Sequence, residues 1–257
     1  MTTSTSRNRI RKAAGGVAAT LFWIAVWQFA SDRIGQEILL VSPVSVVRTL
    51  FSLAAESAFW QTIWFSFSRI AAGFLLAIAA GIALSVLAFN LRVFRVLLSP
   101  LVATVKSIPV ASFVILLLVW VSSENLAVPT SFLMVFPIAY TNLLEGLEAT
   151  DRQLLEMADV FRVTPYRRVL YIYLSNVMPF FATACRLGLG LCFKAGVAAE
   201  VIGIPKNSIG AQLYQAKLYL ETADLFAWTL VIIVMSVVFE KVFMTLVTRI
   251  VRWVRER

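Results

Sequence analysis

Long runs of apolar residues dominate the chain, and their length predicts how it is built. A helix needs about 20 mostly apolar residues to cross a bilayer. Six runs approach or exceed that length: 13–30, 62–89, 96–121, 126–147, 178–202 and 226–248. Strands of a membrane barrel would be shorter and would alternate apolar with polar positions. The pattern therefore predicts an all-α polytopic membrane protein with about six transmembrane helices.

Composition supports this class and narrows the chemistry. Charged residues make up 14% of the chain and hydrophobic residues 60%, with a mean hydropathy of +0.85; soluble domains carry about 25% charged residues. The absence of histidine from the sequence removes the commonest metal ligand and near-neutral acid–base group. Cys185 and Cys192 lie about 10 Å apart along a helix, too far for a disulfide. We expect no metal site and packing roles for both thiols.

The basic residues predict the orientation in the membrane. If six spans alternate from a cytoplasmic N-terminus, the inside holds Arg7, Arg9, Arg11, Lys12, Arg92, Arg95, Arg152, Arg162, Arg167, Arg168, Arg249, Arg252, Arg255 and Arg257. The outside holds only Arg33, Arg48, Lys206 and Lys217. Because basic residues gather on the cytoplasmic side, we expect cytoplasmic tails at 1–12 and 249–257 around a membrane domain at 13–248. The first run is longer than the core of a signal peptide, about 7–15 residues, so we expect it to remain as a span.

A stripe of small residues marks the second run. Gly73, Ala77, Gly81 and Ser85 recur every four residues. Small residues at this spacing let another helix approach closely, although an alanine-rich helix can produce such a stripe by chance. We expect a packing surface, either within one chain or between two copies.

A charged insert separates the fourth and fifth runs, within a cytoplasmic loop at 148–177. The apolar residues at helical spacing are Leu154, Leu155, Ala158 and Phe161, which predicts a helix with one apolar face. Thr164 followed by Pro165 fits an N-cap with proline at the first helical position. The insert therefore predicts two short helices joined at a bend. An amphipathic segment lying on lipid headgroups is the alternative.

This insert resembles the coupling loop of ATP-binding-cassette importer permeases, in which Glu-x-Ala, a glycine and a later proline mark the loop. Glu156 and Ala158 match its start, and Leu174 and Pro179 match its end. Further stretches resemble the sulfonate, taurine and nitrate class in order: "SPVSVVRTL" (42–50), "SFSRIAAGF" (66–74), "VKSIPVASFVILLLVW" (105–120), "FPIAYTNLLEGL" (136–147) and "ETADLFAWTL" (221–230). The resemblance covers most of the chain.

Two positions depart from the family pattern. Arg162 stands where the loop glycine is expected, and Ser175 stands where a proline is usual. Glycine is favoured where the backbone turns through positive φ, and arginine there costs about 1 kcal/mol. The turn therefore either carries this cost or has a different shape.

The resemblance implies partners and a division of labour. A permease of this class pairs with a second permease copy and two ATP-binding subunits, and an extracytoplasmic binding protein delivers the solute. The coupling residues it implies are Glu156, Ala158, Asp159, Phe161, Arg162, Val163, Thr164 and Pro165. The sequence lacks a Gly-x-x-x-x-Gly-Lys-Ser/Thr phosphate loop, so we expect this chain to bind no cofactor and its partner ATPases to use ATP and Mg. We expect no nucleic-acid partner. The class implies a bacterial inner membrane and small anionic solutes such as sulfonates, taurine and nitrate, while near relatives carry pyrimidine vitamin precursors.

Charged residues within the apolar runs are the candidate pathway residues, because intramembrane charges are costly and usually functional. Lys194 lies past the midplane of the fifth run, with Glu200 nearer its outer end, and Lys106 lies beside Pro109 in the third run. We expect Lys194 to attract an anionic solute. A salt bridge to another helix or snorkelling to the interface is the alternative.

Two other functional classes remain in view. A self-sufficient secondary transporter or channel would suit helices broken at Pro109 and Pro137, yet the sequence shows no inverted repeat. An integral-membrane enzyme would need catalytic groups, whereas the chain has no histidine and no paired-carboxylate motif. The importer permease is the leading interpretation.

Overall fold

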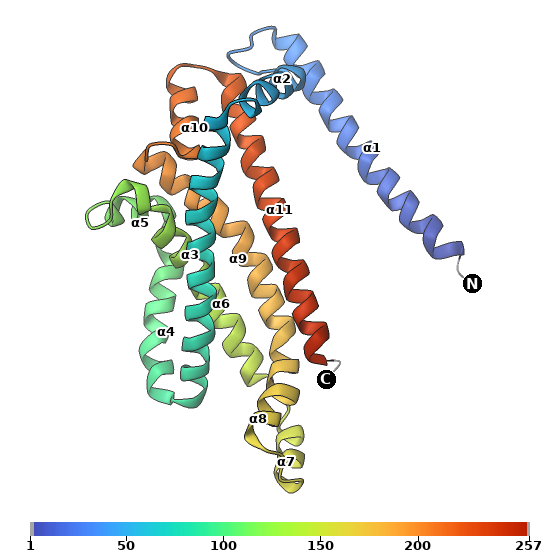
Figure 1. The fold of residues 1–257 in the computed structure, drawn as a ribbon, viewed down its shortest axis with the longest axis vertical. Helices are drawn as coiled ribbons and strands as arrows, with labels where there is room; N and C mark the ends of the chain where they lie inside the picture. Colours follow the sequence, from blue (N-terminus) through green and yellow to red (C-terminus); the bar gives the residue numbers. More distant parts are fainter. Residues whose placement is uncertain (1–2, 256–257) are drawn as a thin grey trace. The chain divides into compact units, whose positions relative to one another are not determined.

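The computed structural model describes the backbone of residues 3–255 and the side chains of residues 15 and 18–250, and over this range it is helical without strands (Figure 1). The longer helices are α1 (Thr3–Ile34), α3 (Ser57–Asn90), α4 (Arg92–Ser107), α6 (Ala127–Glu148), α9 (Leu174–Gly203) and α11 (Thr222–Arg255). The shorter ones are α2 (Pro43–Ala54), α5 (Val110–Leu117), η1 (Ser123–Asn125), α7 (Arg152–Val160), α8 (Pro165–Arg168), the π-helical turn η2 (Val169–Tyr173) and α10 (Ile209–Leu218). The all-α prediction is confirmed. Residues 1–2 and 256–257 of the expected tails lie outside the described residues.

Three helices of the described part are long and apolar enough to cross a membrane: α3, the stretch from η1 through α6, and α11. A fourth span results if the bent pair α4 and α5 counts as one. α9 is 30 residues long, but Arg186, Lys194 and Glu200 interrupt its apolar run. Six spans are consistent with these helices, and that count stays a prediction.

The third run is not one helix. It begins earlier than expected, at Arg92, and it breaks between Ser107 and Val110, where α4 and α5 meet at 106°. Ile108 and Pro109 both adopt extended backbone angles. Proline lacks an N–H and keeps the residue before it out of the helical region, so the run breaks fully at Pro109.

The chain divides into two compact units. The first contains residues 1–59 and 212–230, where Val41, Val46 and Ala227 form a small core. The Trp27 indole N–H donates to the Val41 carbonyl at 3.0 Å. The Thr222 hydroxyl donates to the Ile38 carbonyl at 2.8 Å. These bonds tie the loop between α1 and α2 to the start of α11.

The second unit contains residues 60–211 and 231–257, and α3, α6 and α9 pack together at its centre (Figure 1). A Cβ on Gly73 would overlap the Val128 carbonyl and Ser131 of α6, and one on Gly81 would overlap Ala139. The stripe of small residues therefore packs against α6 of the same chain. This settles the two possibilities left by the sequence in favour of packing within the chain.

Candidate functional site

The charged insert folds into a hairpin of two short helices, α7 and α8, which extends from one end of the second unit (Figure 1). The Asp151 carboxylate caps α7 by accepting the Gln153 N–H at 2.8 Å. Thr164 and Pro165 occupy the N-cap and first positions of α8, as predicted, although the Thr164 hydroxyl makes no capping hydrogen bond. The predicted pair of helices joined at a bend is confirmed.

Arg162 forms the bend and has a positive φ of 52°. Its N–H donates to the Asp159 carbonyl at 3.0 Å, and the Val163 N–H donates to the Ala158 carbonyl at 2.9 Å. This pair of hydrogen bonds is a Schellman motif, which usually places glycine at the left-handed position. The turn thus keeps the shape that glycine favours, and Arg162 carries the cost in backbone conformation.

Arg168 holds the two arms of the hairpin together. Its Nε donates to the Val163 carbonyl at 3.0 Å and one terminal nitrogen donates to the Ala158 carbonyl at 3.3 Å. The same nitrogen pairs with the Asp159 carboxylate at 2.5 Å. A planar guanidinium can serve several acceptors at once. No pattern in the sequence distinguishes this arginine from Arg167, because its acceptors are mainly backbone carbonyls.

The apolar residues that were predicted to form one face of the helix differ in how far they are covered. Ala158 is buried and Leu155 is partly buried, whereas Leu154 and Phe161 are exposed. The outward side of the hairpin carries the exposed apolar residues Leu154, Met157, Val160, Phe161 and Tyr166. Glu156 is exposed as well. Of the expected coupling residues, Ala158 therefore packs inward, and the others are exposed except the half-buried Val163.

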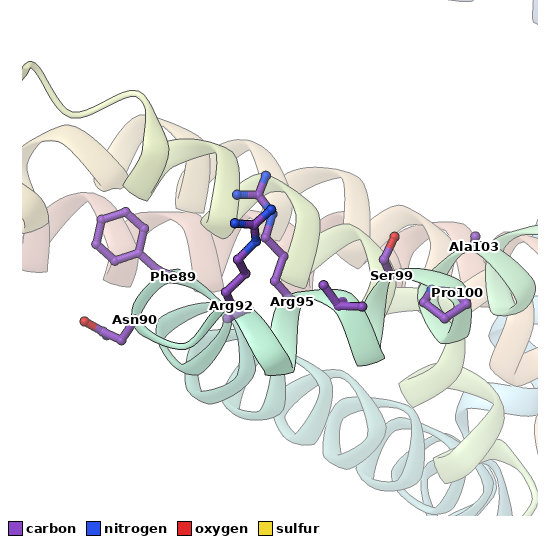
Figure 2. Close-up of a pocket in the computed structure, with 9 residues that line it drawn as sticks. Phe89, Asn90, Arg92, Arg95, Ser99, Pro100 and Ala103 are labelled. Carbon is purple, nitrogen blue, oxygen red and sulfur yellow. The ribbon is translucent and has the colours of Figure 1, made fainter.

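A basic groove runs along α4. A cavity of about 800 Å³ lies beside the start of this helix, where Arg92 and Arg95 project to the same side (Figure 2). Arg95 pairs with Glu148 at the end of α6 at 2.5 Å. A second cavity of about 320 Å³ shares Arg95, Ser99 and Ala103 with the first and continues towards Lys106 and Tyr140. The two cavities place Arg92, Arg95 and Lys106 along one side of α4, which is positively charged although its lining is otherwise largely apolar.

Lys106 and Glu200 have different surroundings, although both were expected to line a pathway. Lys106 is exposed in the last turn of α4 and donates to the Thr141 hydroxyl at 3.5 Å. Glu200 is fully buried, and its carboxylate accepts the Ser66 hydroxyl at 2.8 Å and the Gly210 N–H at 3.1 Å. These bonds fasten α9 to α3 and to the start of α10. Glu200 borders neither of the two cavities along α4, and its role in a pathway stays a prediction.

Lys194 is exposed on α9, while both cysteines of that helix are buried and free. Within the described residues, no cluster of His, Cys, Asp and Glu side chains is arranged to hold a metal ion. Charged features of the described part of the second unit thus include the hairpin, the groove along α4 and the exposed Lys194 on α9.

Comparison with known proteins settles the family. Residues 73–256 match the model of the binding-protein-dependent transport system inner membrane component. The chain belongs to this family. The permease is therefore an integral-membrane subunit of an importer that works with a solute-binding protein and ATPase subunits, and it serves transport rather than catalysis.

Individual relatives are similar over most of their length. The permease is 29% identical over 200 residues to the formylaminopyrimidine transport permease ThiX of Halalkalibacterium halodurans, covering 76% of this chain and 79% of the relative. It is 23% identical over 236 residues to SsuC of Bacillus subtilis, named as an aliphatic sulfonates transport permease, covering 90% and 84%. It is 22% identical over 233 residues to the taurine transport permease TauC of Escherichia coli, covering 88% and 84%.

Proposed function

We propose that the permease forms the pathway for a small anionic or polar solute, such as a sulfonate or taurine, and that two ATPase subunits drive it through the hairpin of α7 and α8. The names of SsuC and TauC support the solute class. The basic groove along α4 supports it independently, because a cationic surface lowers the energy of an approaching anion. Within the complex, the permease itself neither binds nor hydrolyses ATP.

The outward side of the hairpin carries this proposal. Met157, Val160 and Phe161 are exposed beyond the rest of the second unit, and exposed apolar residues grouped in this way mark protein interfaces. The Schellman turn and Arg168 hold the hairpin in one shape, so docking needs little further ordering. An ATPase groove that takes up α7 would cover these side chains and place Glu156 at the interface. This arrangement puts the hairpin on the cytoplasmic side, where the basic residues at 1–12 and 249–257 also favour both termini.

Reversing the charge of Glu156 tests the coupling role. The permease is co-expressed with its ATPase and binding protein, and Glu156→Lys is expected to reduce ATPase co-purification and binding-protein-stimulated ATP hydrolysis by at least about tenfold, since a lysine placed against an ATPase surface that accepts a carboxylate brings like charges together, which costs several kcal/mol. Solute affinity of the binding protein should not change. Glu124→Lys, at an exposed carboxylate on η1, is the matched control. Normal assembly and transport by Glu156→Lys would show that the coupling role is wrong.

A self-sufficient transporter is the competing function. The break between α4 and α5 is the observation that favours it, because secondary transporters often bind solute at broken helices. The purified permease in liposomes, without ATPase subunits, is expected to accumulate neither taurine nor an alkanesulfonate. Uptake by this chain alone, driven by an ion gradient, would replace the proposed function.

A further inference from the structure

One side of α9 is open in the second unit while the rest of the helix is packed. The exposed or half-exposed residues in the middle of α9 are Thr183, Arg186, Leu187, Gly190, Leu191 and Lys194. Arg186, Gly190 and Lys194 follow at intervals of four residues, so they lie within about 80° of one another around the helix. A Cβ on Gly190 would have no neighbour within 4 Å. The two cations therefore flank an open gap.

The positions of the two cations argue against contact with lipid. Arg186 and Lys194 both lie more than about two helical turns from either end of α9. Within the described residues, neither side chain belongs to an ion pair or a hydrogen bond. Unpaired charges at this depth face water or a partner rather than hydrocarbon. Snorkelling would have to carry the two side chains in opposite directions, Arg186 towards the start of α9 and Lys194 towards its end.

We infer that the open side of α9 lines the water-filled pathway, with Arg186 and Lys194 as two successive stations for a small anion and Gly190 as the space between them. This inference rests on the proposed function and adds the residues that would select for negative charge. Each cation lies about 6 Å along the helix from Gly190, so an anion passing this glycine is attracted from both sides. A cation at the same place is repelled twice.

The gap at Gly190 offers a direct test that does not need the natural solute. Gly190→Cys is introduced into the full complex in proteoliposomes, and the rates of modification by a methanethiosulfonate carrying an ethylsulfonate group and by one carrying a trimethylammonium group are measured. The open space around the Cβ allows the fold to accept this change. The wild-type chain, whose two cysteines are buried, and Ile233→Cys on the exposed side of α11 are the controls.

We expect Gly190→Cys to react with both reagents while the controls do not. Adding Lys194→Met should lower the ratio of anionic to cationic reaction rates by about fivefold, as should Arg186→Met, because each removes one unit charge some 6–8 Å away. Lys241→Met, an exposed lysine of α11, should leave the ratio unchanged. A thiol at residue 190 that reacts with neither reagent would place this side of α9 against lipid or a packed interface and overturn the inference. A ratio insensitive to both Met variants would also overturn it.

Failure of the α9 inference can be told apart from failure of the proposed function. An unreactive thiol in a complex that still couples ATP hydrolysis to the binding protein would refute the α9 pathway alone. Loss of coupling in every variant, including Lys241→Met, would instead refute the assembly on which the proposed function depends.

Discussion

At the scale of single residues, Arg162 shows how a family position can change its residue and keep its shape. Its φ of 52° is the conformation in which glycine has no steric penalty. The sequence could identify the position but not its conformation, because a different turn would have served an arginine equally well. The hydrogen bonds from Arg162 and Val163 back to α7 decide the matter.

Replacing this arginine is expected to strengthen the hairpin. Arg162→Gly should stabilise the folded loop by about 1 kcal/mol, since the strain of a left-handed arginine disappears. Hydrogen exchange of the amides in α7 and α8, measured by mass spectrometry in detergent, should slow by up to about fivefold. Arg167→Gly, in the regular part of α8, should do the reverse because glycine weakens helices. Faster exchange in Arg162→Gly would contradict the assignment of strain to this residue.

At the scale of helices, the close approach of α3 to α6 depends on glycine. Gly73→Val should destabilise the detergent-solubilised protein by roughly 1–3 kcal/mol, as overpacked cores do, because the new side chain meets the Val128 carbonyl and Ser131. A lowered thermal unfolding midpoint by fluorescence would record this. Gly190→Ala, where the added Cβ meets nothing within 4 Å, should unfold at or above the parent temperature. Equal midpoints for the two variants would mean that α3 and α6 are less tightly packed than described.

Helices were predictable to the extent that local sequence decides them. The run at 126–147 became α6 at Ala127–Glu148, because an apolar stretch of that length needs no partner to be helical in a bilayer. The π-helical turn at Val169–Tyr173 had no signal in composition or spacing. The bond between Ser66 and Glu200 joins residues 134 positions apart, and periodicity along one helix contains no information about such a contact. The apolar face of α7 shows the same limit, since its pattern could not say which apolar residues would stay exposed.

At the scale of the whole molecule, the packing of Gly73 and Gly81 inside one chain means that a second copy must bind elsewhere. The open side of α9 carries the two cations of the inferred pathway, so we expect two copies to face each other there across it. Single cysteines at residue 190 in native membranes should form a permease pair with a flexible bifunctional crosslinker, whereas Ile233→Cys should not. A stable complex with one copy of this chain beside a different permease would contradict the homodimer.

The second arm of the hairpin and the open side of α9 belong to one continuous helical segment. α8, η2 and α9 follow one another without a gap from Pro165 to Gly203, and about 44 Å of helix rise separates Pro165 from Lys194. A continuous helix of this kind fixes the rotational orientation of its side chains as well as their position, since inserting one residue turns every later residue by about 100°. The π-helical turn at Val169–Tyr173 lies between the hairpin and the part of α9 that carries Arg186 and Lys194. Its wider winding contributes to the direction in which these two cations point. Under the proposed coupling, a twist that the ATPases apply to the hairpin would rotate Lys194, so that work done by ATP hydrolysis in the cytoplasm would act within the membrane as torque along one backbone.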